Sequence, residues 1–556
     1  MSNNQPTQNL LKEVENLKDE IKQLKSRKRY GLVWEEKPEQ VVELCKEKLP
    51  VLAEDREREI KSDGDKPVNI LIEGDNYHAL SVLNYTHEKK IDVIYIDPPY
   101  NTGAKDWKYN NNFVDINDLW RHSKWLSMMK NRLVLAKKLL KQDGVLICSI
   151  DENEQAHLGV LLEELFQNHE IHCITIVHNP RGVQGKNFSY SHEYTFFVFR
   201  KGVEVIGSKQ REEVLEEELR DHGGESLRTD AKNCFYPILV KNDSIVGFGD
   251  VPLKNFHPNG KNVQRKDKTI EVWPIDVRGV ERKWVFARNT VEEIKNKLFV
   301  AKKKNGQIDI FRRKDTQKPR TVWIGKKYDA STFGSKIVNG LTGTLFPFPK
   351  SLYNTKDCLE CVVKQRKKAV VLDYFAGSGT TGHAVALLNK EDNGNRQFIL
   401  CTNNENGIAQ DICYPRIKAV IKGNKEYKDI TGITSNLKYF RTDFVDGATT
   451  DKNKKKLVDK STEMLCLKED CFEKVKTGRH FDMFKNPKGK YLGIIYDDNG
   501  IENFKKEVKK LNKNFVVYVF SLDDSAREEE FEDMKNLVEL KPIPAVILNV
   551  YKRIFK

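Results

Sequence analysis

Residues 91–103 read IDVIYIDPPYNTG, a short apolar run that ends in Asp97-Pro98-Pro99-Tyr100. The run predicts a strand that is buried on both faces, as strands of parallel sheets are. Two successive prolines cannot donate backbone hydrogen bonds, so the strand ends in a stiff turn. The turn holds a carboxylate beside a phenol at the carboxyl end of a strand, where α/β sheets bind ligands. The stretch therefore predicts a constrained binding site on an α/β sheet.

Strands and helices alternate on both sides of this stretch. Residues 68–76 (VNILIEGDN) predict a strand and its turn, and residues 144–154 (GVLICSIDENE) predict another buried strand. Residues 118–144 have the pattern of a long amphipathic helix that ends at Gly144, a plausible C-cap. Strands are also expected at 172–179 and 193–200. This alternation predicts a mostly parallel α/β sheet.

A glycine-rich turn follows a second apolar strand in residues 367–390, KKAVVLDYFAGSGTTGHAVALLNK. Asp373, Gly377 and Gly379 lie between the strand and the next helix, and glycines there let the backbone approach a ligand closely. A P-loop does not fit, because no lysine follows the glycines. Gly377, Gly379 and Gly382 have the GxGxxG spacing of a dinucleotide site, but two further polar residues in the strand and turn weaken that interpretation. A purely structural strand-to-helix turn remains an alternative.

Between these two parts, residues 201–340 predict a basic, mainly β insertion. Short strand-like pieces alternate with Lys, Arg, Asn and Gly. Aromatic residues are interleaved with the bases, at Tyr236, Trp273, Trp284, Phe311 and Trp323. Basic side chains can neutralise phosphates, and Arg, Asn and Gln can reach base edges, so the insertion is a candidate DNA-recognition module. A solvated β insertion without a binding role is the alternative.

The two ends of the chain carry no chemical motif. Apolar residues recur at heptad spacing from Leu10 to Leu24, so residues 1–29 predict a helix that seals a dimer or docks on its own domain. Residues 442–556 predict a small α/β unit with an interaction role.

Composition narrows the class of protein. The 556 residues suggest about three to four domains. The net charge of +14 favours an acidic partner such as nucleic acid, although a lysine-rich solvated surface is also compatible with it. No apolar run is long enough to cross a membrane, and the polar N-terminus does not resemble a secretory signal. The ten cysteines are scattered and Cys358 and Cys361 have no second pair, so we expect a cytoplasmic protein without a metal site.

The two turns together suit methyl transfer to an amine. Asp97 and the Pro98 carbonyl can each accept a hydrogen bond from the exocyclic amine of an extruded adenine, and Tyr100 can stack on the base. A methyl donor held by the glycine turn then needs only in-line positioning.

These motifs resemble the β group of S-adenosylmethionine-dependent DNA amino-methyltransferases, in which DPPY precedes FxGxG. DPPY favours adenine N6 over cytosine N4. Residues 71–80 (LIEGDNYHAL), 346–353 (FPFPKSLY) and 401–421 (CTNNENGIAQDICYPRIKAVI) further resemble the modification (Mod) subunits of type III restriction systems. The resemblance implies a Rossmann-like doubly wound sheet with an inserted, mainly β target-recognition domain.

The resemblance also implies a role for each motif residue. Asp97, Pro98, Pro99 and Tyr100 would hold the target adenine, with His192, Glu193 and Tyr194 near the flipped base. The methyl donor would meet Asp373, Phe375, Gly377 and Gly379 on its methionine side, Thr380 and Lys350 at its carboxylate, and Asp75 and Asn76 at its adenine. Many relatives have an acid for the ribose where Thr402, Asn403 and Asn404 stand in this chain, with Glu405 just beyond; of this segment, Asn404 is the expected cofactor-binding residue.

For the whole chain, the resemblance implies a site-specific adenine methyltransferase. Its expected parts are an N-terminal helix (1–29), a catalytic half (30–200), a target-recognition domain (201–340), a cofactor half (341–441) and a C-terminal interaction domain (442–556). Expected partners are double-stranded DNA, a second copy of the chain and a restriction (Res) helicase-nuclease subunit. The alternatives are a recognition scaffold that delivers such a helicase-nuclease, and an orphan methyltransferase without a restriction partner.

Overall fold

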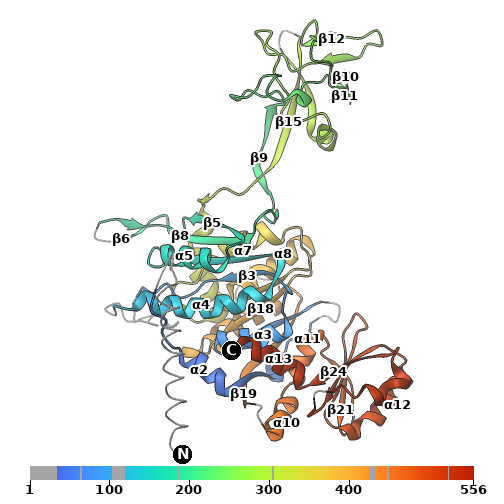
Figure 1. Ribbon diagram of the computed structural model, residues 1–556. Coiled ribbons are helices and arrows are strands. Elements are labelled where there is room, and N and C mark those ends of the chain that lie inside the picture. Colours follow the sequence, from blue (N-terminus) through green and yellow to red (C-terminus); the bar gives the residue numbers. More distant parts are fainter. Residues whose placement is uncertain are drawn as a thin grey trace, which may run out of the picture. The chain divides into compact units, whose positions relative to one another are not determined.

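The computed structural model describes residues 34–62, 66–102, 119–184, 187–303, 306–424, 432–447, 450–523 and 525–555. The helix predicted at 1–29, and the dimer it was expected to seal, lie outside these residues. The chain divides into two compact units, one formed by 1–207 with 320–556 and the other by 208–319 (Figure 1).

A ten-stranded sheet forms the centre of the larger unit. From β19 to β4 all neighbouring strands are parallel, whereas β8 runs antiparallel to both of its neighbours. In spatial order the strands are β1 (Lys48–Glu54), β19 (Asn436–Asp446), β2 (Val68–Glu73), β18 (Gln397–Thr402), β17 (Val370–Asp373), β3 (Ile91–Ile96), β4 (Leu140–Ile150), β8 (Glu193–Arg200), β5 (His169–Ile176) and β16 (Val322–Trp323).

The strand order brings the two predicted ligand turns together. The chain leaves β17 for β18 on one side, and it leaves β3 for β4 on the other. β17 and β3 are themselves hydrogen-bonded neighbours, with Leu372 opposite Ile94. Crossovers that leave in opposite directions open a crevice at the carboxyl ends of the two central strands, where α/β sheets bind ligands. The turns that follow Asp373 and Ile96 lie at this crevice.

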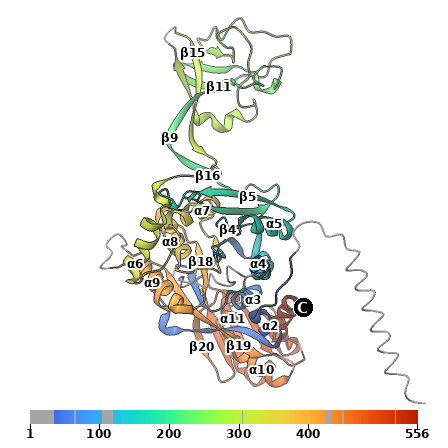
Figure 2. The same ribbon diagram turned by 90° about the vertical axis from the view of Figure 1, so that its left-hand side faces the viewer.

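Helices cover both faces of the sheet (Figure 2). Ile94 and Ile96 of β3 belong to one hydrophobic core, whereas Val93 and Tyr95 belong to the other. Successive side chains of a strand point to opposite faces, so β3 is buried from both sides. The first core includes residues of α3 (Asn76–Thr86), α4 (Arg121–Leu139) and α5 (Gln155–Leu165), and the second includes residues of α7 (Leu352–Val363), α8 (Thr380–Asp392) and α9 (Tyr414–Lys422). The predicted Rossmann-like, doubly wound α/β sheet is confirmed.

One predicted helix end is wrong. Helix α4 ends at Leu139, and Gly144 lies inside strand β4 instead of capping the helix. A Cβ atom at Gly144 would come within 3.0 Å of the Ile91 carbonyl oxygen. The glycine therefore permits a close approach of β4 to the start of β3, which is another reason for a glycine in a strand.

The smaller unit, 208–319, contains two antiparallel sheets. Three of its interleaved aromatics are buried, since Tyr236 and Trp284 have no exposed surface and Trp273 is only 3% exposed, whereas Phe311 is partly exposed. The three buried aromatic residues therefore build the core of the unit, while Trp323 lies on β16 of the larger unit. The sheets are formed by β14 (Leu298–Lys302), β15 (Ile308–Gln317) and β9 (Lys209–Glu218), and by β11 (Ser244–Phe248), β10 (Ile238–Lys241), β13 (Ile270–Val272) and β12 (Asn262–Gln264).

The C-terminal part of the larger unit has a five-stranded sheet of its own. Helices α11 (Thr462–Glu469) and α13 (Ala545–Ile554) of this part pack beside α3. The Lys468 ammonium donates to the Tyr85 carbonyl oxygen at 3.0 Å, and the Tyr551 hydroxyl donates to the Pro50 carbonyl oxygen on β1. Among the described residues, no helix is long and apolar enough to span a bilayer. The strands are β20 (Glu473–Thr477), β21 (Phe481–Lys485), β22 (Tyr491–Ile495), β23 (Phe515–Phe520) and β24 (Val538–Ile543), and α12 (Ile501–Leu511) connects β22 to β23.

Candidate active site

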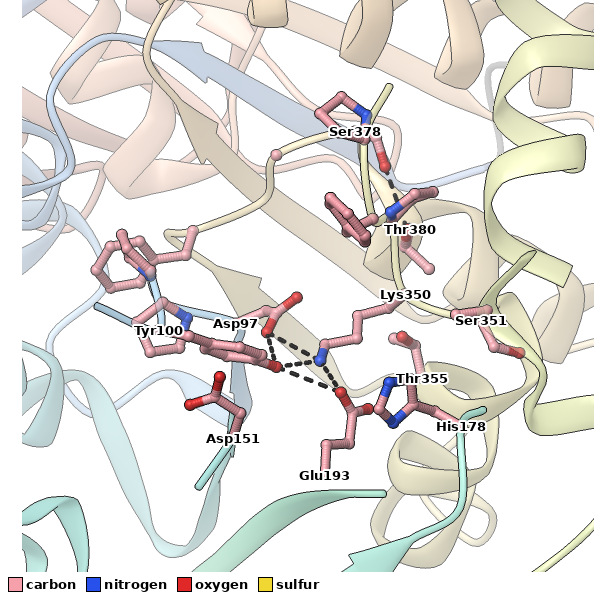
Figure 3. A pocket seen from close by; sticks show the side chains of 18 of the residues that line it. Asp97, Tyr100, Asp151, His178, Glu193, Lys350, Ser351, Thr355, Ser378 and Thr380 are labelled. Carbon is pink, nitrogen blue, oxygen red and sulfur yellow. Dashed lines mark hydrogen bonds and ion pairs between the residues drawn. The ribbon is translucent and has the colours of Figure 1, made fainter. Parts of the chain in front are cut away.

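A cavity of about 390 Å³ lies at the crevice between β3 and β17 (Figure 3). Both predicted turns line it, although they are far apart in the sequence. Of the residues singled out from the sequence, the following line the cavity: Asp97, Pro98, Pro99, Tyr100, His192, Glu193, Lys350, Asp373, Phe375, Gly377 and Thr380.

The Asp-Pro-Pro-Tyr turn is held by hydrogen bonds on two sides. The Tyr100 hydroxyl donates to Asp97 Oδ1 at 2.7 Å, and the buried Trp125 indole donates to the Pro99 carbonyl oxygen at 2.7 Å. Burial raises the pKa of Asp97, and Glu193 raises it further against the opposing effect of Lys350. The pKa of Tyr100 is well above its usual value, also through burial, so its hydroxyl remains a donor.

The Lys350 ammonium lies among the acidic groups of this turn. It contacts the Tyr100 hydroxyl and a Glu193 carboxylate oxygen, lies 3.4 Å from Asp97 Oδ1, and is 4.6 Å from the centre of the Tyr100 ring. Burial alone would lower the pKa of Lys350, but Asp97 and Glu193 raise it. In this structure Lys350 is thus a partner of the Asp97 carboxylate, whereas the resemblance predicts a place at the cofactor carboxylate.

Of the three residues on and beside β8 that the resemblance places near the flipped base, His192 and Glu193 line the cavity and Tyr194 does not. The Glu193 side chain is almost fully buried, and its Oε1 accepts a hydrogen bond from Asn354 at 2.9 Å. His192 bonds the Tyr194 hydroxyl at 3.1 Å. Asn354, in the first turn of α7, gave no signal in the sequence.

Further titratable residues line the cavity without having been predicted, among them Asp151 and His178. Asp151 follows β4, the neighbour of β3, and burial raises its pKa to about 7. Its place directly after a buried strand could have identified it in the sequence. His178 lies beyond β5, and burial lowers its pKa, so the ring is neutral near pH 7.

The glycine turn is braced from within by Asp373. This buried carboxylate accepts from the Phe375 backbone N–H at 2.9 Å and from the Thr381 hydroxyl at 2.5 Å, and burial raises its pKa to about 7. Gly379 has φ +79°, and a Cβ there would lie 3.0 Å from Cys413 Sγ. The turn therefore requires a glycine at this position, although Gly379 itself does not line the cavity.

A second cavity, of about 430 Å³, adjoins the first. Pro99 and Phe375 line both, so the two cavities meet at these side chains. Asp75 and Asn76 line the second cavity, as do Asn403 and Glu405. Asp75 also caps α3 by accepting from the Tyr77 N–H at 2.7 Å.

Asn404 lines neither of the two cavities. Its Oδ1 accepts a hydrogen bond from the Gln410 backbone N–H at 3.1 Å. The side chains on the cavity from this segment are those of Thr402, Asn403 and Glu405, and Glu405 is the acid among them.

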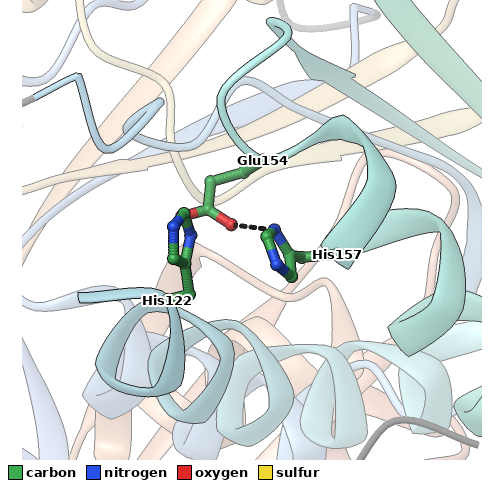
Figure 4. A group of neighbouring side chains, drawn as sticks. All are labelled: His122, Glu154 and His157. Carbon is green, nitrogen blue, oxygen red and sulfur yellow. Dashed lines mark hydrogen bonds and ion pairs between the residues drawn. The ribbon is translucent and has the colours of Figure 1, made fainter. Parts of the chain in front are cut away.

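A cluster of His122, Glu154 and His157 (Figure 4), here called the clasp, contacts the chain just after Tyr100 through Asn101. Asn101 is buried in a left-handed conformation, with φ +60°, and its Nδ2 donates to Glu154 Oε1 at 2.5 Å. His122 Nδ1 lies 2.7 Å from the same oxygen, and His157 Nδ1 lies 3.0 Å from Glu154 Oε2. Burial raises the pKa of Glu154 to about 7.

His122, Glu154 and His157 are close enough together to be considered as metal ligands. However, Arg121 Nε donates to His122 Nε2 at 3.1 Å. Since a neutral imidazole has one donor nitrogen and one acceptor nitrogen, His122 Nδ1 carries the proton and donates to Glu154. The clasp is therefore held by the hydrogen bonds that Asn101 and His122 donate to Glu154, with the His157 ring stacked on the His122 ring.

The fold and the paired turns define an α/β protein with a ligand cavity at the point where the strand order reverses. Comparison with known proteins narrows this class, since residues 91–431 match the family model described as DNA methylase. Type II methyltransferase M.KpnI of Klebsiella pneumoniae is 31% identical over 394 residues, which cover 67% of this chain and 88% of that protein. The chain belongs to the DNA methylase family, and the predicted resemblance to DNA amino-methyltransferases is confirmed.

Two more matches are similar over most of the chain. The Mod subunit of the type III restriction-modification enzyme EcoPI of Escherichia phage P1 is 29% identical over 404 residues, which cover 64% of this chain and 60% of the subunit. The chain thus spans about three fifths of that relative's length. The crystal structure of the M1.HpyAVI–SAM complex matches 63% of this chain and 98% of its own, with 12% identity and a TM-score of 0.30.

Proposed function

We propose that this protein is a site-specific DNA methyltransferase that transfers the methyl group of S-adenosylmethionine to N6 of an extruded adenine in duplex DNA. The observation that carries the proposal is the meeting of Asp97 and the glycine turn in one cavity at the point where the strand order reverses. Neither turn alone distinguishes a methyltransferase from other α/β proteins.

The residues around the two cavities fit such a cofactor. The turn at Gly377 and Gly379 leaves room for a ligand close to the backbone, and the second cavity offers Asp75 and Glu405 as acceptors for hydroxyl groups. Pro99 and Phe375, where the cavities meet, would lie beside the cofactor, which would extend from one cavity into the other. When bound, the cofactor supplies an electrophilic methyl group on a sulfonium.

The chain's own residues then prepare the target amine. Asp97 accepts a hydrogen bond from one amine N–H and the Pro98 carbonyl from the other, while the Tyr100 ring stacks on the base. Methyl transfer from the sulfonium to the amine nitrogen would form a nitrogen–methyl bond, break the sulfur–methyl bond and release one proton from the amine. Asp97 can take that proton because its pKa is raised. Lys350 has to withdraw from Asp97 towards Glu193 to admit the amine.

The decisive experiment is methylation-sensitive sequencing of DNA from cells that express the chain. We expect N6-methyladenine at one recurring sequence, and none in cells that express the Asp97→Ala variant. Methylation of cytosine N4 at a recurring sequence would contradict the choice of base, and methylation by Asp97→Ala would contradict the assigned chemistry.

We also propose that the chain serves as the modification and recognition subunit of a type III restriction system in the cytoplasm, with unit 208–319 as its target-recognition domain. Similarity to a Mod subunit supports this, and so does the presence of all ten cysteines as free thiols. Co-purification with a helicase-nuclease would support the subunit role. A chain that methylates DNA but purifies without such a partner from its native cells would be an orphan methyltransferase instead.

A further inference from the structure

A guanidinium lies buried beneath the glycine turn. Arg416, on α9, is fully buried, and its Nη1 donates to the Thr380 hydroxyl oxygen at 2.8 Å and to the Ser378 hydroxyl oxygen at 3.0 Å. Its Nε and Nη2 have no hydrogen-bond partner. No carboxylate of the described residues lies within 4.0 Å of it. A buried charge without a counter-ion destabilises a fold, so its retention points to an anion that is present at another time.

Arg416 keeps its charge at neutral pH. Burial lowers its pKa, but only to about 10. Lysine would lose its charge more readily at such a site, whereas the delocalised guanidinium tolerates burial better. The cavity next to the turn therefore lies close to a permanent positive charge.

The hydrogen bonds of Arg416 also set the direction of two hydroxyl groups. A guanidinium only donates, so the oxygens of Ser378 and Thr380 accept from it and their hydrogens point elsewhere. Both residues line the cavity (Figure 3), and their hydroxyl oxygens are 3.4 Å apart. One of the two hydrogens can join these oxygens, which leaves the other to donate into the cavity. Thr380 also begins α8, whose first N–H groups have no partner within the helix.

We propose that Arg416, acting through the hydroxyls of Ser378 and Thr380, positions and neutralises the carboxylate of the methyl donor. The inference rests on the proposed function and adds a positioning residue to it. An oriented hydroxyl, a helix N-terminus and a buried cation together form an anion site. Lys350, to which the resemblance gives the cofactor carboxylate, already neutralises Glu193 and Asp97.

Two ligands that differ at the carboxylate end provide the test. S-adenosylhomocysteine retains the amino-acid end, and 5′-methylthioadenosine lacks it. Their dissociation constants are measured by calorimetry for the wild type, for Arg416→Met and for the matched variant Lys350→Met. We expect Arg416→Met to weaken S-adenosylhomocysteine about 10- to 100-fold, the range for hydrogen bonds to a charged group, and to leave methylthioadenosine nearly unchanged. Lys350→Met should leave the ratio of the two constants near the wild-type value.

A second pair of substitutions covers the case in which Arg416→Met does not fold. Ser378→Ala with Thr380→Val removes the hydroxyls and should weaken binding of S-adenosylhomocysteine relative to methylthioadenosine. Thr380→Ser alone should leave the relative affinity for the two ligands at the wild-type value. The inference would be overturned if the variant without the two hydroxyls kept the wild-type preference for S-adenosylhomocysteine over methylthioadenosine, or if Lys350→Met lost that preference instead. Wild-type protein that binds neither ligand would contradict the proposed function itself.

Discussion

Asp97 combines two properties that rarely occur together in one carboxylate. It is fixed by the Tyr100 hydroxyl, so its orientation is set before any substrate binds. Its pKa is nevertheless raised, by burial and by Glu193, so it can accept a proton. A group with both properties can orient an amine and then deprotonate it.

Replacement of Asp97 by asparagine separates these two properties. The amide keeps the shape and one acceptor, but it cannot take a proton. We expect methylation by Asp97→Asn to fall by about 100-fold or more, the lower end for loss of a general base. The dissociation constant of S-adenosylhomocysteine, measured by calorimetry, should stay within about twofold of the wild-type value. Equal loss of cofactor binding would show that Asp97 acts on the cofactor instead.

Asp373 should make stability depend on pH. Its pKa is about 7 in the folded protein and near 3.8 when unfolded, so the folded state binds the proton more tightly. The stabilisation is complete below about pH 4 and is lost as the pH rises towards 7. Asp373→Asn mimics the protonated form, because its amide can serve both the Phe375 N–H and the Thr381 hydroxyl. Between pH 5 and 8, the midpoint temperature of thermal unfolding should therefore fall less in Asp373→Asn than in the wild type.

At the scale of elements, the sequence predicts the residues at the strand ends better than the residues that other elements contribute to the site. Asp97 and Gly377 were found because strand, turn and helix signals are local. Arg416, Glu154 and Asn354 reach the site from other helices or from a helix start, and only the packed fold brings them there. The Gly144 error has the same origin, since the reason for that glycine is the carbonyl of Ile91.

The clasp at Glu154 ties α5 to the end of the catalytic turn. We expect Glu154→Ala to lower kcat by about tenfold or more through misplacement of Tyr100, with the KM values for DNA and cofactor little changed. Glu163→Ala, an exposed change of equal charge on α5, is the control. Normal kcat in Glu154→Ala would contradict a positioning role for the clasp.

Asn101 has a left-handed backbone conformation, which Asn101→Gly tolerates and Asn101→Ala strains. Asn101→Ala should therefore unfold at a lower temperature than Asn101→Gly.

At the scale of the whole molecule, recognition and chemistry are assigned to different compact units. Unit 208–319 has a hydrophobic core of its own around Tyr236 and Trp284, and the cavities lie wholly in the larger unit. The insertion could be located in the sequence because the α/β alternation stops there. The sequence did not show that its aromatic residues are core residues, which the structure does.

Replacement of residues 208–319 by a short Gly/Ser linker tests this division. The variant should bind S-adenosylhomocysteine with nearly wild-type affinity, because both cavities remain. It should lose methylation at the recognition sequence, as measured by sequencing of treated DNA. Retained methylation at that sequence would place recognition in the larger unit.

The order of strands in the sheet has a consequence for synthesis on the ribosome. β2 and β3 are made early, but β18 and β17 stand between them, and these are made only after the smaller unit. At ~5–20 residues per second, the nascent chain waits roughly 15 to 60 s with two strand edges unpaired. Unpaired edges invite association with other chains, so fragments that stop before β17 should be insoluble or held by chaperones. A truncated gene would then yield neither methylation nor a stable partial subunit.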